Sequence, residues 1–122
     1  MLLLRAVMLS LGLLAIAVIL PLMGRAGSSP AKNKTIGIGI RSKWTRASPE
    51  AWVAGHAAAY PLLTAAGVIA GVLGVLTLLL ALLLGGSWGY GPALFTGTVG
   101  YLAVIVLTVT AIRRSIVAAR AV

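Results

Sequence analysis

The 122-residue chain contains no cysteine and no aspartate, and it has a single glutamate, Glu50, and a single histidine, His56. The absence of cysteine excludes disulfides, thiolate nucleophiles and cysteine metal ligands in this chain. One carboxylate per copy excludes a pair of carboxylates for general acid–base catalysis. A metal site needs three or four ligands, and Glu50 and His56 would point to different faces of one helix. We therefore expect a non-enzymatic protein with no catalytic residue, no metal site and no cofactor.

Charged residues of any kind are scarce. They make up 9% of the chain, against about 25% in soluble domains, while 61% of the residues are hydrophobic. Such a composition cannot provide a water-facing surface, so it predicts an integral membrane protein. The net charge of +9 then indicates membrane orientation and contact with anionic lipid headgroups. Nucleic-acid binding is disfavoured, because no soluble module remains to carry it.

The apolar residues form three long runs, at 1–23, 61–84 and 92–112. A helix of about 20 residues crosses a hydrocarbon core of about 30 Å, so each run predicts a transmembrane helix. Arg5 is the only charge in the first run and lies close enough to its end to reach the headgroups. A cleaved signal peptide is the alternative for this run. The uncharged segment 85–91 predicts a turn outside the cell, and 113–122 predicts a tail.

Basic residues indicate the orientation of these spans. With three spans, the segment 24–60 and the tail lie on the same side, and together they carry nine of the ten basic residues. Cytoplasmic segments of membrane proteins are enriched in Lys and Arg, so this side is expected to be the cytoplasm, with the N-terminus outside. The same split disfavours a signal peptide, because cleavage would tend to leave a strongly basic loop outside.

The segment 24–60 should contain the functional part of the chain. After a Gly/Ser/Pro-rich connector at 24–30, isoleucine and glycine alternate over 36–40, which favours an extended stretch. Ser48, Pro49 and Glu50 are a helix-start signal, since they supply a cap, a suitable first residue and a first-turn acid. The sequence therefore predicts an interfacial helix from about residue 49, bent or restarted at Pro61.

Trp52, His56 and Tyr60 follow one another at spacings of four, so they should share one face of this helix. The rings of Trp52 and Tyr60 would suit headgroup depth. We expect His56 to form a hydrogen bond to Trp44, Thr45 or a backbone carbonyl, and Trp52 and His56 to pack against the segment 39–45. A role of His56 in pH sensing or ligand binding is the alternative, because an unperturbed histidine titrates near pH 6.5.

The second span carries a stripe of small residues that includes Gly67, Gly71 and Gly74. Such stripes let helices approach closely in lipid. The helix that packs on the stripe could be another span of this chain or a partner subunit, and we favour the internal neighbour. The complete prediction is an all-α membrane protein with three transmembrane helices, a cytoplasmic motif loop, and an interfacial helix between the first two spans.

The central segment resembles the signature of the SdpI family of small bacterial membrane proteins. The matching positions are Gly39, Arg41, Trp44, Thr45, Trp52 and His56, in the same order and register. Ser42, Lys43, Arg46 and Ala57 depart from the family pattern, and Lys43 and Arg46 make the loop more basic. The family's namesake is a larger immunity protein that protects a cell from a secreted peptide toxin and sequesters a repressor at the membrane. The resemblance therefore implies a multi-pass protein of the bacterial inner membrane.

Two functions remain open. In the first, the loop docks a membrane protein partner, with Arg41, Lys43 and Arg46 binding acidic or phosphate-bearing groups and Trp44 and Trp52 anchoring it at the membrane–water boundary. In the second, the chain is a structural accessory subunit of a larger bacterial membrane complex and packs through its glycine-rich helix faces. A weaker third function is binding of anionic lipid headgroups by the loop.

Overall fold

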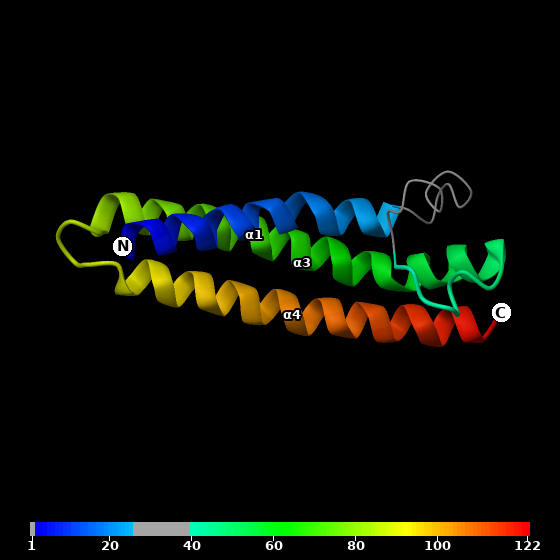
Figure 1. The fold of residues 1–122 in the computed structure, drawn as a ribbon. Helices are drawn as coiled ribbons and strands as arrows, with labels where there is room; N and C mark the ends of the chain where they lie inside the picture. Colours follow the sequence, from blue (N-terminus) through cyan, green and yellow to red (C-terminus); the bar gives the residue numbers. More distant parts are fainter. Residues whose placement is uncertain (1, 26–39) are drawn as a thin grey trace.

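The computed structural model of the protein describes residues 2–25 and 40–122, which form three long helices. They are α1 (Leu2–Arg25), α3 (Pro49–Leu84) and α4 (Gly91–Arg120). Each is long and apolar enough to cross a membrane, and no strand occurs among the described residues. The prediction of an all-α protein with three spans is confirmed. Figure 1 shows the helices side by side, with α3 antiparallel to the other two and the two termini at opposite ends.

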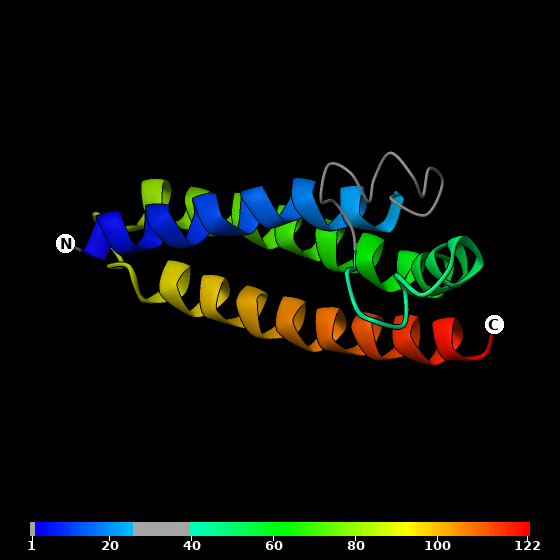
Figure 2. The same ribbon diagram turned by 45° about the vertical axis from the view of Figure 1, so that its right-hand side comes forward.

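Helix α3 begins at the predicted signal. The side chain of Ser48 accepts a hydrogen bond from the backbone N–H of Ala51 at 3.0 Å, and Pro49 is the first helical residue. The helix then continues without interruption through Pro61 to Leu84. The predicted interfacial helix is thus not a separate element, since it forms the first turns of α3. Figure 2 shows these turns more nearly end-on than the rest, a change of direction expected where Pro61 removes an intrahelical hydrogen bond.

Helix α4 also extends further than its apolar run. Arg113 and Arg114 end the uncharged stretch, yet the helix continues to Arg120, so the predicted tail is largely helical. Arginine is a good helix former, and a change in polarity alone does not end a helix. The loop 40–48 lies next to this basic end of α4 (Figure 1). We call this the loop end of the bundle.

Helix α3 packs against both of the other helices, and small residues make the close approach to α1. Cβ atoms added at Gly67 and Gly74 would lie 2.7 Å from Pro21 Cγ and 3.1 Å from Leu13 Cβ. One added at Gly71 would lie 3.5 Å from the Cβ atom of Ala17. The glycine stripe of α3 therefore packs against α1, which is the internal neighbour of the two that the sequence left open.

One hydrogen bond also joins these two helices. The hydroxyl of Ser10 on α1 donates to the backbone carbonyl of Gly74 at 2.8 Å, in the buried interface. The glycine leaves room for this contact, because a larger residue would hold the helix backbones apart. The α1–α3 interface therefore combines close packing with a polar link, and this fixes how the two helices meet.

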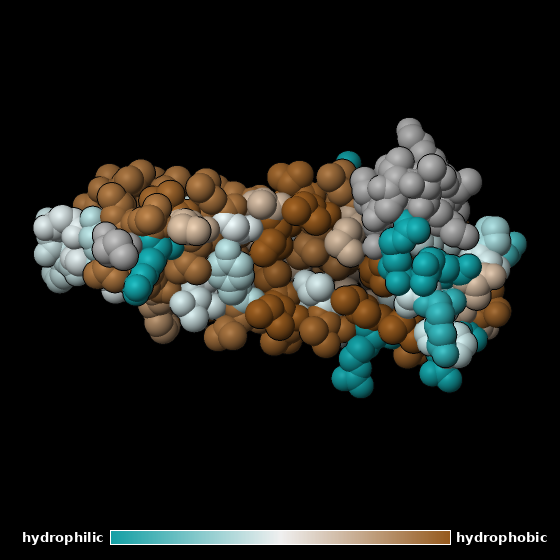
Figure 3. Space-filling model, viewed as in Figure 1, coloured by the Kyte–Doolittle hydropathy of each residue, from teal (hydrophilic) through white to brown (hydrophobic). Residues whose placement is uncertain are grey.

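The surface of the bundle is divided into an apolar body and a polar end. Figure 3 shows hydrophobic residues along the middle and hydrophilic ones gathered at the loop end. Large apolar side chains are strongly exposed on the body, as at Leu83, Phe95 and Val106. The 36 residues of α3 extend about 54 Å, well over the roughly 30 Å of a hydrocarbon core. Part of α3 must therefore lie outside that core.

Candidate docking site at the loop end

The loop 40–48 is folded on itself by short-range hydrogen bonds. The hydroxyl of Thr45 donates to the carbonyl of Ile40 at 2.8 Å and accepts from the backbone N–H of Ser42 at 3.0 Å. In return, the backbone N–H of Thr45 donates to the hydroxyl of Ser42 at 3.1 Å. Ile40 and Thr45 are buried. Their side chains hold the loop against the helices, while the turn between them faces outwards.

His56 fastens this loop to α3. Its Nε2 accepts a hydrogen bond from the backbone N–H of Ile40 at 2.9 Å, and its Nδ1 lies 2.8 Å from the carbonyl of Trp52. The amide of Ile40 can only donate and the carbonyl can only accept, so the ring is neutral with its proton on Nδ1. The expected contact between His56 and the segment 39–45 is present. Both ring nitrogens are used for structure, which leaves His56 no nitrogen for a ligand.

Trp52 completes the buried part of the site. Its ring lies against that of His56, with centroids 4.2 Å apart and planes inclined by 36°. The side chain of Trp52 is fully buried, so the prediction that it anchors the protein at the membrane–water boundary is wrong. Steps of four residues rotate by about 40° around a helix, and this moves Tyr60 out of the buried face. Tyr60 is 40% exposed and can still meet an interface.

Gly55 is the point where the loop, α3 and α4 come together. A Cβ atom there would lie 2.8 Å from Thr45 Cγ2 and 2.9 Å from the hydroxyl of Ser115. Real Cβ contacts are longer, so only glycine allows this three-way packing without displacement. Sequence reasoning did not identify Gly55 or Ser115 as site residues. Gly55 directly precedes His56, and this position could have marked it as a site residue. Nothing in the sequence connects Ser115 with the loop.

Trp44 links the outer side of the loop to the end of α4. Lys43 Nζ and Arg120 Cζ each lie 4.7 Å from the centroid of its ring. A cation at this distance from an indole ring is attracted by its negative face. Trp44 is half-buried by these contacts. The loop is therefore held from inside by His56 and from outside by the Trp44–Arg120 contact.

The predicted site residues fall into two sets. Arg41, Lys43 and Arg46 are exposed, whereas Thr45, Trp52 and His56 are buried beneath them. Gly39 lies outside the described residues, as do the connector from residue 26 onwards and the isoleucines at 36 and 38. The loop end thus has buried residues of the loop and of α3 that fix the shape of the loop, and exposed basic residues on the loop itself.

More basic side chains surround the loop at the same end of the bundle. Arg113, Arg114 and Arg120 are exposed on the last turns of α4, and Arg25 is exposed at the end of α1. Glu50 is the only acidic residue of the whole chain. This end of the protein therefore has a strongly positive potential, which favours anionic groups.

A family model described as the SdpI/YfhL protein family matches residues 32–117. The chain belongs to the SdpI/YfhL family. In this member, the matched range contains the loop, all of α3 and most of α4, together with the buried residues Thr45, Trp52, His56 and Ser115. Helix α1 and Arg120 lie outside it. No curated protein and no solved structure matches the chain.

Proposed function

We propose that this SdpI/YfhL-family protein is a non-enzymatic membrane protein that docks an acidic partner on its loop end. The kind of role that the family resemblance implies is immunity against a peptide toxin or signalling at the membrane. The observation that carries the proposal is a division between buried and exposed residues at the loop. Thr45 and His56, which we call the buried clamp, hold the loop by hydrogen bonds. Arg41, Lys43 and Arg46 form an exposed basic face. A loop that only connected two spans would not need a histidine with both ring nitrogens engaged.

The clamp matters because it preorganises the basic side chains. Arg41, Lys43 and Arg46 stand on a turn whose backbone is held by Thr45 and His56. A preformed loop loses less conformational entropy on binding than a flexible one. Arginine can pair with a carboxylate through two parallel hydrogen bonds, which adds geometric specificity to charge attraction. An acidic segment of a partner protein fits this surface.

The orientation that we propose has the loop end in the cytoplasm of a bacterial cell, at the inner membrane. Its support is the uneven distribution of basic residues, nine of which belong to 24–60 and the tail. Because the chain has no cysteine, single cysteines can test this. A membrane-impermeant maleimide should label Ser87→Cys in intact cells and Ala47→Cys only after permeabilisation. The reverse pattern would show the opposite orientation.

The alternative function, a structural accessory subunit, has weaker support. It relies on glycine-rich helix faces being available to a partner, but Gly67 and Gly74 pack against α1. Substituting them with leucine would therefore disturb the fold of the chain itself. Association through another apolar face of the bundle would still fit this alternative.

A triple substitution of the exposed basic residues tests the docking proposal. Arg41→Gln, Lys43→Gln and Arg46→Gln together remove three charges and leave the buried clamp intact. We expect this variant to lose partner recovery from native membranes in mild detergent and to lose any toxin tolerance that the wild type confers. Arg5→Gln, at the other end of the bundle, is the control for loss of charge. Unchanged recovery and unchanged tolerance in the triple variant would contradict docking.

The same triple variant distinguishes binding of lipid headgroups by the loop from docking of a protein. If the basic face only contacts headgroups, the triple variant loses affinity for vesicles that contain anionic lipid and recovers the same proteins as the wild type. If it docks a protein, an acidic segment of that protein should compete in neutral detergent without lipid. This second result is the one that we expect.

A further inference from the structure

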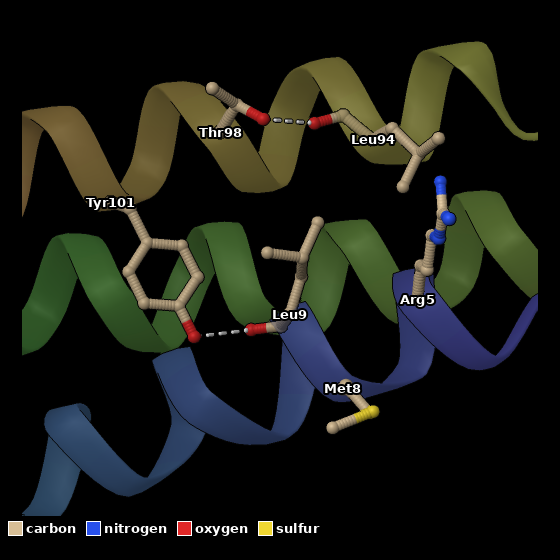
Figure 4. A pocket seen from close by; sticks show the side chains of 6 residues that line it. All are labelled: Arg5, Met8, Leu9, Leu94, Thr98 and Tyr101. Atoms are coloured by element: carbon tan, nitrogen blue, oxygen red, sulfur yellow. Dashed lines mark hydrogen bonds between the residues drawn. The ribbon is translucent and has the colours of Figure 1, made fainter. Parts of the chain in front are cut away.

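A second surface feature lies at the end of the bundle opposite the loop. A groove of about 520 Å³ runs between α1 and α4 and is open to the outside. Figure 4 shows the six side chains that line it: Arg5, Met8, Leu9, Leu94, Thr98 and Tyr101. Helices α1 and α4 both pack mainly on α3 and only lightly on each other, which leaves the space between them unfilled.

Two residues that line the groove carry hydroxyl groups, but both hydroxyls already donate hydrogen bonds within the protein. The hydroxyl of Tyr101 donates to the carbonyl of Leu9 at 3.1 Å, and that of Thr98 donates to the carbonyl of Leu94 at 2.8 Å (Figure 4). Both donors are therefore already used within the protein. What remains for an occupant is mostly the hydrocarbon of Met8, Leu9 and Leu94, so its body must be apolar.

One charge lies at the end of this apolar groove. Arg5 projects from α1 towards Leu94 of α4 in Figure 4. The only acidic residue of the chain, Glu50, belongs to the first turn of α3 at the loop end. No carboxylate side chain of the protein can therefore neutralise Arg5. An occupant that complements the groove is apolar along its length and anionic at the end that meets Arg5.

We propose that this groove binds one anionic phospholipid. One acyl chain lies along Met8, Leu9 and Leu94, and the phosphate meets the guanidinium of Arg5. Guanidinium groups bind phosphate through paired hydrogen bonds, and a basic residue near the membrane surface contributes about 1 kcal/mol to binding of anionic lipid, or about fivefold in affinity. The site is at the opposite end of the bundle from the docking loop, so it is independent of the proposed function.

Methionine methyl groups allow the test on the full-length protein. Met8 lines the groove, so its methyl group reports on lipid bound there. The protein is labelled with ¹³C at its methionine methyls and placed in bicelles that contain phosphatidylglycerol or phosphatidylcholine with a nitroxide on the acyl chain. We expect labelled phosphatidylglycerol at low mole fraction to relax the Met8 methyl about fivefold more than labelled phosphatidylcholine does.

Three variants give the proposal its specificity. Arg5→Gln should abolish the preference for phosphatidylglycerol at Met8, whereas Arg5→Lys should retain most of it. Thr98→Phe fills the groove at an exposed position and should reduce relaxation of Met8 by both lipids. Equal relaxation by the two lipids in the wild type would overturn the proposal. So would a preference that survives Arg5→Gln, or relaxation of Met8 by both lipids that Thr98→Phe leaves unchanged.

Discussion

The backbone N–H of Ile40 donates to Nε2 of His56 at 2.9 Å, and this hydrogen bond joins the start of the described loop to the second turn of α3. Ile40 and His56 are both buried, so neither the N–H nor the ring nitrogen has water as an alternative partner. The same ring also bonds the carbonyl of Trp52 and lies against the indole of that residue. The only histidine of the chain therefore determines the position of the loop that carries the exposed basic residues.

Replacing His56 with alanine should loosen the loop without unfolding the bundle. The substitution leaves the buried N–H of Ile40 without an acceptor, which costs about 1–3 kcal/mol. We expect amide hydrogen exchange at Ile40 to accelerate about 5- to 150-fold, while exchange in the middle of α3 stays slow. Tyr60→Ala, one turn further at an exposed position, is the control and should leave Ile40 unchanged. Equal protection of Ile40 in the His56 variant would show that the bond does not hold the loop.

The protonation state of His56 is a second prediction. The two hydrogen bonds require a neutral ring with its proton on Nδ1, because protonated Nε2 would face the N–H of Ile40. Nitrogen NMR of the histidine ring in bicelles at neutral pH should therefore show a protonated Nδ1 and an unprotonated Nε2. Acidification that protonates the ring should lower the protection of the Ile40 amide relative to its intrinsic exchange rate at the same pH, since the acceptor is lost. An Nε2–H tautomer at neutral pH would contradict the geometry.

Two glycines of the same stripe should respond differently to alanine. At Gly67 a Cβ atom would lie 2.7 Å from Pro21 of α1, and at Gly71 it would lie 3.5 Å from the Cβ atom of Ala17. Overpacking typically costs about 1–3 kcal/mol, so Gly67→Ala should lower thermal stability in detergent. Gly71→Ala makes an ordinary contact and adds helix propensity, so it should be neutral or stabilising. No loss of stability in Gly67→Ala would mean that the α1–α3 contact is looser than the structure shows, and an equal loss in Gly71→Ala would mean that the helices lie closer there.

The contact between Trp44 and Arg120 should be measurable as a coupling energy. Cation–π pairs contribute about 0.5–2 kcal/mol, depending on how far water is excluded. A double-mutant cycle of Trp44→Leu and Arg120→Gln, followed by thermal unfolding, should show favourable coupling in this range. The corresponding cycle with Arg113→Gln should give none, because Arg113 lies two helical turns earlier. Additive effects in the first cycle would show that the two side chains do not interact in solution.

Gly55→Ala tests the junction of the loop with α3 and α4. The added methyl group would lie 2.8 Å from Thr45 Cγ2, so the loop or the end of α4 must move. We expect faster exchange at the amides of Ile40 and Thr45, together with a loss of stability of about 1–3 kcal/mol. Ala58→Gly, at a half-buried position of the same helix, changes helix propensity without touching this junction. It should leave amide exchange at Ile40 and Thr45 unaltered.

The sequence determined the class of the protein and its spans, because these depend on local composition. Apolar runs of about 20 residues cross lipid as helices, since every backbone polar group must be satisfied within the segment. The start of α3 was equally local, because Ser48 and Pro49 act on backbone groups next to them. The contact of His56 with the segment 39–45 was also expected from its register with Trp52.

The tertiary structure decided which of these residues are buried and what they contact. Trp52 was expected at the membrane–water boundary, yet its side chain is fully buried in the folded chain. The approach of Ser115 to Gly55 and of Arg120 to Trp44 joins residues 60 or more positions apart. Such contacts depend on how α4 packs against α3. The composition thus determined the three helices, and their packing turned a basic connecting segment into a loop held in place by a buried histidine of α3.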